Sequence, residues 1–160
     1  MRRCCLALAL TLAACSRPEP RATTTNATTM TLSSPAFANN AAIPAKFTCD
    51  GANTSPPLTI AGVPADAKSL ALTVEDPDAP GGTFTHWSTW KIPPSTSSIA
   101  EGQHVGTEEQ NGFGKPGYGG PCPPSGLHHY VFTLYAMADE APPAKGKVLG
   151  QTQLIGTYKK

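Results

Sequence analysis

The segment His129–Met137 reads His-Tyr-Val-Phe-Thr-Leu-Tyr-Ala-Met and decides the fold class. One set of alternate side chains includes Tyr130, Phe132 and Leu134, and the other set is also largely apolar. Because successive side chains of a strand point to opposite faces, both faces of this strand would be apolar. A strand of that kind is covered on both sides by the rest of the protein. The segment therefore predicts a central strand of a β-sheet.

Further short strands are expected along the chain, separated by turns rich in proline, glycine and asparagine. The strand at Ser69–Glu75 alternates most regularly, since Leu70, Leu72 and Val74 would share one face. A single short helix is expected near Lys145–Gln151, although its two glycines weaken it. The remaining expected strands are Met30–Ser33, Leu58–Ile60, His86–Ile92 and Gln153–Tyr158.

The composition supports a single domain made of short strands. Only 14% of the 160 residues are charged, against roughly 25% in an average globular chain. The 15 glycines and 17 prolines argue against a long-helix protein or a coiled coil. The formal net charge of +1 comes without a basic stripe, so we expect no nucleic-acid partner. Many short strands without helical periodicity predict an all-β fold, an antiparallel sandwich or barrel.

The N-terminal segment has the order of a bacterial export signal. Arg2 and Arg3 precede the apolar run Cys5–Ala14, which is too short to span a bilayer as a helix but fits a signal peptide. The run leads into the tetrapeptide Leu-Ala-Ala-Cys, which resembles the lipobox of bacterial lipoproteins, with Cys15 as the lipidated residue. The alternative is an ordinary signal peptide that happens to be followed by a cysteine.

The lipobox divides the chain into three parts. Residues 1–14 would be a signal peptide that is removed, and residues 15–29 would be a flexible tether without large apolar side chains. Residues 30–160 would form the folded domain. Ser16 follows the cysteine, and inner-membrane retention usually needs aspartate at that place. We therefore expect a lipid anchor in the outer membrane of a bacterial cell envelope, with the domain facing the periplasm.

The five cysteines are an odd number for an exported protein. Cys4 and Cys5 would leave with the signal peptide, and Cys15 would carry the lipid. Cys49 and Cys122 then form an even pair in an oxidising compartment, which predicts one disulfide. The alternative is a pair of separate buried thiols, because the sequence does not determine the distance between them.

Two segments gather polar groups at the ends of expected strands. They are residues 75–87, which read EDPDAPGGTFTHW, and residues 119–130, which read GGPCPPSGLHHY. Strand alternation places Asp76 at the end of the apolar face of β-strand 69–75. By the same alternation, His86 would share a face with Trp90 and Ile92.

In the second segment, His128 and Tyr130 would share a face with the apolar residues that follow, while His129 would point the other way. Polar groups at the ends of apolar faces are partly desolvated and need partners. Such groups mark a candidate functional site.

Several chemistries could use these groups. The imidazoles of His86 and His128 and loop N–H groups could hold an anion, with Asp76 orienting a histidine. The same three side chains could bind a metal, but no ligand spacing typical of metal sites is present. A hydrolase could use Ser125, but the G-x-S-x-G motif is absent. The remaining alternative is that these residues are only structural.

The segments DPDAPGGTFTHW and GYGGPCPPSGLHHYVFTLYA resemble the two signature motifs of the phosphatidylethanolamine-binding protein family. They are most similar to its bacterial Raf-kinase-inhibitor-like branch, and the resemblance runs from about Met30 to Lys160. It implies an all-β fold: a two-sheet antiparallel Greek-key β-sandwich with a few short peripheral helices. Further agreement comes from Ile43-Pro44, Phe47–Gly51, Ser55–Leu58 and Leu154–Tyr158.

The resemblance also implies a small surface pocket that binds an anion, typically a phosphate-bearing head group. Within it, the N–H groups of Gly120 and Cys122 would donate to the anion and His86 would bind it. Asp76 would hold an imidazole by its second nitrogen. Carried over position by position, the ligand-binding residues would be Asp76, Asp78, His86, Gly120, Cys122, His128 and Tyr130.

The sequence departs from the family pattern before the last strand. The family usually has a longer helical stretch there, with a histidine in a Gly-x-Val-Leu sequence, whereas here only Asp139–Lys147 fills the gap. We expect a shortened C-terminal helix and a more open pocket. Lys147, which replaces the histidine, would be either a further contact to the anion or a solvated lysine.

The expected function is therefore a binding protein, not an enzyme, because no activated nucleophile can be named. Its ligand would be a small anion, phosphate or a phosphoethanolamine-like molecule, and the lipid would attach it to the membrane. No cofactor and no metal are expected. The first alternative is a protein-interaction or inhibitor module with an unidentified partner. The second is a weak hydrolase or metal enzyme that uses the Asp/His cluster.

Overall fold

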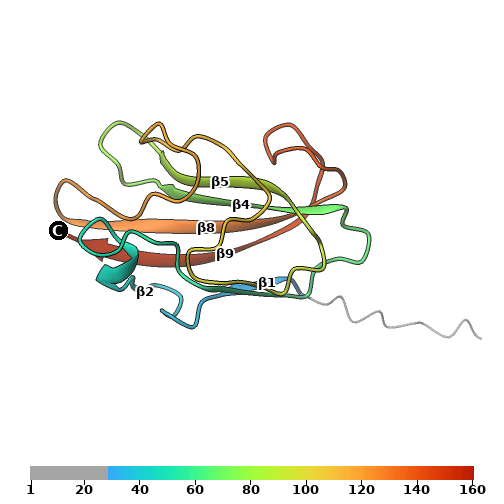
Figure 1. The fold of residues 1–160 in the computed structure, drawn as a ribbon, viewed down its shortest axis with the longest axis horizontal. Coiled ribbons are helices and arrows are strands. Elements are labelled where there is room, and N and C mark those ends of the chain that lie inside the picture. Colours follow the sequence, from blue (N-terminus) through green and yellow to red (C-terminus); the bar gives the residue numbers. More distant parts are fainter. Residues whose placement is uncertain (1–28) are drawn as a thin grey trace, which may run out of the picture.

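The strand β8 (Leu127–Met137) lies inside the larger of two β-sheets, between β4 (Ser69–Asp76) and β9 (Val148–Lys159) (Figure 1). This position confirms the prediction of a central strand. The computed structural model describes residues 29–160. The strand order of the larger sheet is β2-β9-β8-β4-β5-β7. Its other strands are β2 (Ala41–Ala42), β5 (Phe84–Ile92) and β7 (Thr107–Glu108).

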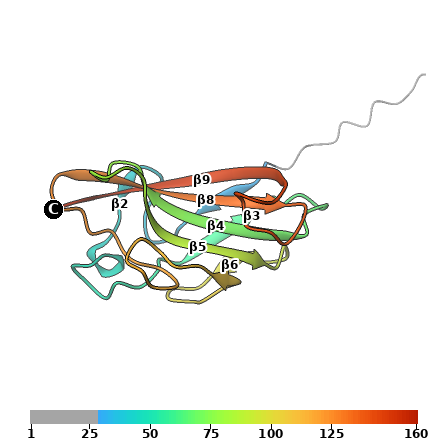
Figure 2. The ribbon, with the colours of Figure 1, turned by 90° about the horizontal axis from the view of Figure 1, so that it is seen from above.

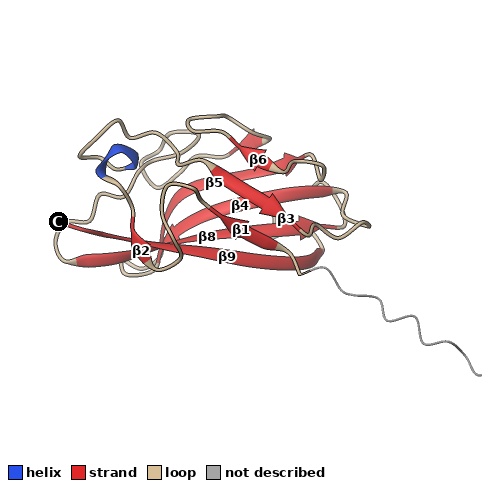
Figure 3. Cartoon of the chain, turned by 90° about the horizontal axis from the view of Figure 1, so that it is seen from below, coloured by secondary structure: helices blue, strands red, loops and turns tan. Residues whose placement is uncertain are grey.

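A smaller sheet lies across one face of the larger one (Figure 3). Its order is β1-β3-β6, with antiparallel neighbours. The side chains between the sheets form the core, and Leu70, Leu72 and Val74 of β4 are completely buried there. Burying one such side chain contributes about 1.5–3 kcal/mol. The strands of the smaller sheet are β1 (Thr31–Ser33), β3 (Leu58–Ala61) and β6 (Ser98–Ile99).

The two-sheet, all-β architecture confirms the expected fold class, with two differences in detail. The chain between residues 29 and 160 contains no α-helix, and the expected peripheral helices reduce to one 3-10 turn, η1 (Ala45–Phe47). The pairing of β2 with β9 is parallel, whereas all other strand pairs are antiparallel. The Greek-key connection stays a prediction.

The prediction of a helix near Lys145–Gln151 is wrong. In its place the chain makes a turn, and β9 begins at Val148. The carboxylate of Asp139 accepts hydrogen bonds from the N–H groups of Ala141 and Lys147, both at 3.0 Å. These bonds close the turn, and glycines on either side of Val148 disfavour a helix. Pairing with β8 then satisfies the backbone of β9.

Two irregularities interrupt the pairing of β5 with β4. Val74 pairs with Trp87 while the next residue, Glu75, pairs with Thr85, so His86 is an extra residue in β5. A second shift lies near Lys91, which has a φ of 57°. A bulge re-aims side chains and ends simple alternation. The expectation that His86 shares a face with Trp90 is therefore wrong, because it assumed an uninterrupted strand. His86 and Ile92 are both buried on the core side, because the second shift restores the alternation.

The termini of the described chain lie at opposite ends of the sandwich (Figures 1 and 2). The chain enters through β1 at one end, and β9 ends with the C-terminus at the other. The expected signal peptide of residues 1–14, the lipidated Cys15 and the tether up to residue 28 lie outside the described residues. Within residues 29–160, no helix is long and apolar enough to cross a bilayer.

Cys49 and Cys122 form a disulfide, as predicted, with their Cα atoms 5.4 Å apart. The bond joins the segment after η1 to the loop before β8, across a sequence separation of 73 residues. It is therefore a covalent link between the loop at residues 119–126 and the connection from β2 to β3. A crosslink of such a long loop removes much conformational entropy from the unfolded chain.

We predict that the double variant Cys49→Ser/Cys122→Ser loses about 2–5 kcal/mol of unfolding free energy. Urea unfolding of the variant and of the wild type measures the loss. The wild type treated with a reductant is the matched control and should lose the same amount. An unchanged urea midpoint in the reduced wild type would contradict the stabilising role of the disulfide.

Candidate functional site

Asp76 and His128 form a buried pair at one end of the larger sheet. The antiparallel pairing of β4 and β8 brings the last residue of β4 close to the second residue of β8. Nδ1 of His128 lies 2.7 Å from Oδ2 of Asp76, and the two residues are only 6% and 3% exposed. Since a carboxylate accepts, the ring nitrogen donates, which determines the tautomer of His128. The expectation that Asp76 holds an imidazole is confirmed.

The other oxygen of Asp76 shapes the loop that follows β4. Oδ1 accepts a hydrogen bond from the N–H of Asp78 at 2.9 Å. A side chain that binds the backbone two residues later stabilises a turn. Asp76 therefore ends the strand, starts the loop and orients His128 with a single carboxylate.

His86 is held from both its backbone and its side chain by Gly119. Nδ1 of His86 lies 2.7 Å from the carbonyl oxygen of Gly119, and the N–H of Gly119 donates to the carbonyl oxygen of His86 at 2.8 Å. The bulge in β5 turns the ring toward the pair of Asp76 and His128. Burial lowers the pKa of His86 below its ordinary value, so the ring is neutral at pH 7.

In both rings Nδ1 therefore forms a hydrogen bond inside the protein, and Nε2 is left without such a bond. No hydrogen bond among residues 29–160 involves Nε2 of His86 or of His128. A neutral imidazole with Nδ1 protonated offers a lone pair at Nε2, and a charged imidazole offers an N–H there. The pair can thus accept a proton from a ligand or donate a charged hydrogen bond to it.

These groups line a cavity of about 180 Å³ at the ends of β4, β5 and β8. Asp76, His86 and His128 supply its polar wall, and Phe84, Phe113 and three prolines supply its apolar wall. The ring centroid of His86 lies 5.0 Å from that of Phe84 and 5.6 Å from that of Phe113. Cys122 lines the cavity as well, so the structure brings four of the seven expected ligand residues together.

Tyr130 lies beneath the cavity and is completely buried. Its ring is 5.1 Å from that of His86, and its hydroxyl has no hydrogen-bond partner among the described residues. Burial, and then the negative charge of Asp76, raise the pKa of Tyr130. The hydroxyl is therefore neutral and keeps its proton.

Cys122 lines both this cavity and a neighbouring hollow of about 270 Å³, whereas Gly120 lines only the neighbouring hollow. The N–H of Gly120 already donates to Oδ1 of Asn53 at 2.7 Å, so it is paired inside the protein. A Cβ at residue 120 would lie 2.6 Å from the carbonyl oxygen of Phe47, which leaves room only for glycine. Gly120 thus permits a close backbone approach, and its expected role as a donor to an anion stays a prediction.

Asp78 lies on the outer side of the loop and does not line the cavity. Its Oδ2 accepts hydrogen bonds from the backbone N–H of His129 at 2.8 Å and from Nδ1 of His129 at 2.7 Å. These bonds lower the pKa of Asp78. His129 points away from the core, as alternation predicted. Asp78 therefore fastens the loop to β8, and nothing in the geometry brings it to a ligand in the cavity.

The sequence analysis missed Phe113, which forms one side of the cavity mouth. This ring is 49% exposed and packs edge-on against Phe84, with ring centroids 4.8 Å apart. It follows Gly112, where a Cβ would lie 2.4 Å from the ring of Phe84. An aromatic residue between Gly112 and Gly114 in a polar loop was the available signal.

Two further candidate residues lie outside the cavity. Ser125 is exposed and does not line the cavity, and Lys147 is also exposed and outside it. Within residues 29–160, no group of three or more histidine, cysteine, aspartate or glutamate side chains could hold a metal ion. The geometry therefore offers two imidazoles and a carboxylate for hydrogen bonding.

Comparison with known proteins agrees with this geometry. The family model for phosphatidylethanolamine-binding protein matches residues 33–159. The chain belongs to the phosphatidylethanolamine-binding protein family. The resemblance expected from the two motifs is confirmed, and the match covers both the cavity residues and the two-sheet core.

Relatives of the family span most of this chain. A UPF0098 protein of Methanothermobacter thermautotrophicus is 43% identical over 150 residues, which cover 82% of this chain and 99% of the relative. LppC of Mycobacterium tuberculosis, which bears the name of a lipoprotein, is 44% identical over 162 residues, with coverages of 87% and 80%. Neither of these names is that of an enzyme.

Solved structures show the same fold. The homologue CT736 from Chlamydia trachomatis superposes with a TM-score of 0.77 and is 36% identical, with 83% of this chain and 99% of that chain covered. YbcL of E. coli superposes with a TM-score of 0.73 and is 29% identical, with coverages of 82% and 98%. The architecture described above is therefore the family architecture.

The lowered pKa of His86 predicts a specific pH dependence of stability. As the pH falls below about 6.5, His86 becomes protonated in the unfolded chain, whereas in the folded protein it stays neutral to a lower pH. The unfolding free energy should therefore decrease between pH 7.5 and pH 5.5. The aspartates with lowered pKa values lose their contribution only below about pH 4, outside this window.

In the variant His86→Gln this part of the decrease should disappear. Urea unfolding at pH 7.5 and pH 5.5 measures it, and His104→Gln, at an exposed histidine away from the cavity, is the matched control that keeps the wild-type decrease. Equal decreases in wild type and His86→Gln would show that His86 is not held neutral by burial.

Proposed function

We propose that this chain is a lipid-anchored binding protein whose 180 Å³ cavity takes a small anionic group, such as the phosphate of a head group. The observation that carries the proposal is the hydrogen bonding of the two histidines. In each ring Nδ1 donates to an acceptor inside the protein, which leaves Nε2 available to a ligand. Two such nitrogens on one small cavity suit a compact oxyanion better than an extended apolar molecule.

The charge balance of the cavity follows from its hydrogen bonds. The Asp76 carboxylate is occupied by His128 and by the N–H of Asp78, so its oxygens face donors inside the protein. The carboxylate on Nδ1 fixes the orientation of the His128 ring in the cavity wall. An anion that enters would therefore find Nε2 of His128 without an internal partner.

His86 adds a proton-linked contact. It is neutral in the empty cavity because burial lowers its pKa. An anion beside Nε2 favours the charged ring, so binding of a fully ionised anion should take up a proton. A phosphate that still carries a hydroxyl can instead donate to the neutral ring. Each charged hydrogen bond contributes about 1.5–3 kcal/mol.

The walls define what can accompany the anionic group. Phe84, Phe113 and the prolines give an apolar rim with an exposed aromatic edge. A short aliphatic group next to the anion, as in a phosphorylated amine or alcohol, would contact this rim. The family name refers to such a head group, and that supports the choice of phosphate-bearing ligands.

The other functions are less well supported. The hydrolase alternative lacks its nucleophile in the cavity, since Ser125 does not line it. For the metal-enzyme alternative, the carboxylate of Asp76 is already bonded to His128, and His86 is bonded to the carbonyl oxygen of Gly119. The inhibitor-module alternative stays a prediction, without a residue of this chain that carries it.

Titration with phosphoethanolamine, followed by the imidazole NMR signals of the full chain, tests the binding site. The signals of His86 and His128 should move in a saturable way, and His86→Ala should weaken binding at least about tenfold. Sulfate, whose charge is constant over this range, should bind more tightly at pH 5.5 than at pH 7.5. His104→Ala is the matched control and should bind as the wild type does.

Absence of any response at His86 and His128 would exclude the cavity as the anion site. Equal sulfate affinity at both pH values would show instead that His86 takes up no proton on binding.

The lipid anchor has its own test. Cys15→Ala removes the residue of the lipobox that would carry the lipid, so the variant should leave the membrane fraction and appear in the soluble fraction. Fractionation of bacteria that express the full chain, with Cys49→Ala as a control that retains Cys15, measures the change. Normal membrane partitioning of Cys15→Ala would contradict the anchor. The name of the relative LppC supports the proposal of an envelope lipoprotein.

A further inference from the structure

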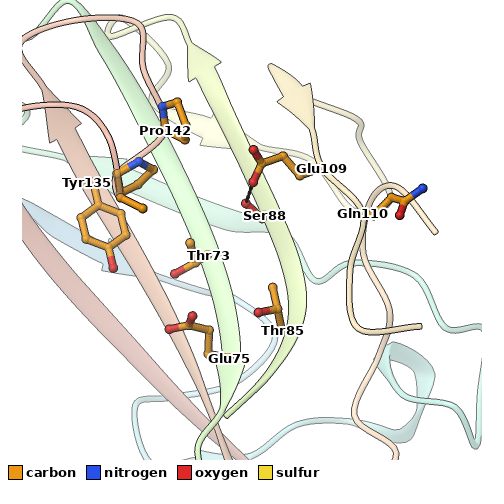
Figure 4. Close-up of a pocket in the computed structure, with 10 residues that line it drawn as sticks. Thr73, Glu75, Thr85, Ser88, Glu109, Gln110, Tyr135 and Pro142 are labelled. Carbon is orange, nitrogen blue, oxygen red and sulfur yellow. Dashed lines mark hydrogen bonds between the residues drawn. The ribbon is translucent and has the colours of Figure 1, made fainter. Parts of the chain in front are cut away.

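The outer face of the larger sheet carries a hollow that shares no residue with the cavity at His86. It has a volume of about 450 Å³ and lies over β4, β5 and β8 (Figure 4). The turn at residues 142–144 borders it on one side, and residues 109–110 border it on the other. The volume is within the range of small-molecule sites, about 300–1,000 Å³.

The floor of this hollow is a polar row across neighbouring strands. Thr73 of β4 pairs with Ser88 of β5 on one side and with Thr133 of β8 on the other. Two residues further along β4, and so on the same face as Thr73, Glu75 pairs with Thr85. Side chains at paired positions share one face, so hydroxyls and a carboxylate stand together where the sheet turns away from the core.

Two groups of this floor lack hydrogen-bond donors. The hydroxyl oxygen of Thr73 is inaccessible to water and has no partner within residues 29–160. Glu75 is half-buried, and in the same part of the chain no hydrogen bond or ion pair holds its carboxylate. Burying an unpaired polar group is unfavourable, and more so for a charged one. The carboxylate of Glu75 is therefore available to a ligand that brings hydrogen-bond donors into the hollow.

The charge of the lining has one sign. Glu75 and Glu109 are both acidic, and no lysine, arginine or histidine lines the hollow. One oxygen of Glu109 accepts from the hydroxyl of Ser88 at 2.7 Å, which fixes the carboxylate at the rim (Figure 4). Tyr135 contributes an aromatic wall next to Pro142. Carboxylates beside an aromatic ring attract a cation by charge and by the negative face of the ring.

We propose that this outer hollow is a second binding site and that it takes a small organic cation with hydrogen-bond donors, such as a primary amine. The ammonium group supplies the donors that the carboxylate of Glu75 lacks. Glu109 closes the site from the rim, and the ring of Tyr135 contacts the aliphatic part of the ligand. The site lies on the face opposite the core, so it works independently of the anion cavity.

Titration of the full chain with 1,4-diaminobutane, followed by backbone amide NMR signals, tests this site. Saturable shifts should centre on residues 73, 75, 85, 88 and 135. The neutral isostere 1,4-butanediol and the anion butanoate, at matched ionic strength, should give none. Replacing Glu75 by glutamine should weaken the diamine at least about fivefold, whereas Asp66→Asn, an exposed acidic residue outside the hollow, should change it by less than about twofold.

Glu109→Gln is the second variant, because its exposed side chain can change without disturbing the sheet. It should also weaken the diamine. An equal response to 1,4-butanediol would overturn the cation as the ligand. Shifts that do not saturate and spread over all exposed carboxylates, or unchanged affinity in both glutamate variants, would overturn the site. The phosphoethanolamine titration of His86 is unaffected by any of these results.

Discussion

The hydrogen bond from Nδ1 of His128 to Asp76 is the contact on which the cavity depends. Both side chains are almost fully buried, so neither could turn to bulk water if the other were removed. An orphaned buried polar group costs about 1–3 kcal/mol, and a charged one costs more. The same contact joins the ends of the two strands in the middle of the sheet. The contact that fixes the geometry of the cavity therefore also joins the two strands that carry the core.

The larger sheet serves two different environments from the same strands. On the inner face, the apolar side chains of β4 and β8 fill the core and end in polar groups that are satisfied by each other. On the outer face, Thr73 and Glu75 alternate with those core residues and lack such partners in residues 29–160. Alternation thus gives one strand, β4, a part in both proposed sites.

Much of the fold followed from alternation, and the errors have physical causes. The apolar pattern around Phe132 predicted the central strand, and uninterrupted strands such as β8 placed His128 correctly. The bulge at His86 inserts one residue, which a period-two argument cannot detect. The bond from Gly120 to Asn53 and the wall formed by Phe113 depend on loops that meet only in the folded chain. The resemblance to a family supplied the list of site residues, but not which of them touch one cavity.

The most direct test of this account is the tautomeric state of the two cavity histidines, measured by long-range ¹H–¹⁵N NMR on the full chain. At pH 7.5 both rings should carry the proton on Nδ1, with Nε2 unprotonated in His86. Addition of sulfate should convert the Nε2 of His86 toward the protonated form. A proton on Nε2 instead of Nδ1 in the ligand-free protein would contradict the hydrogen bonds to Gly119 and Asp76, and with them the proposed anion site.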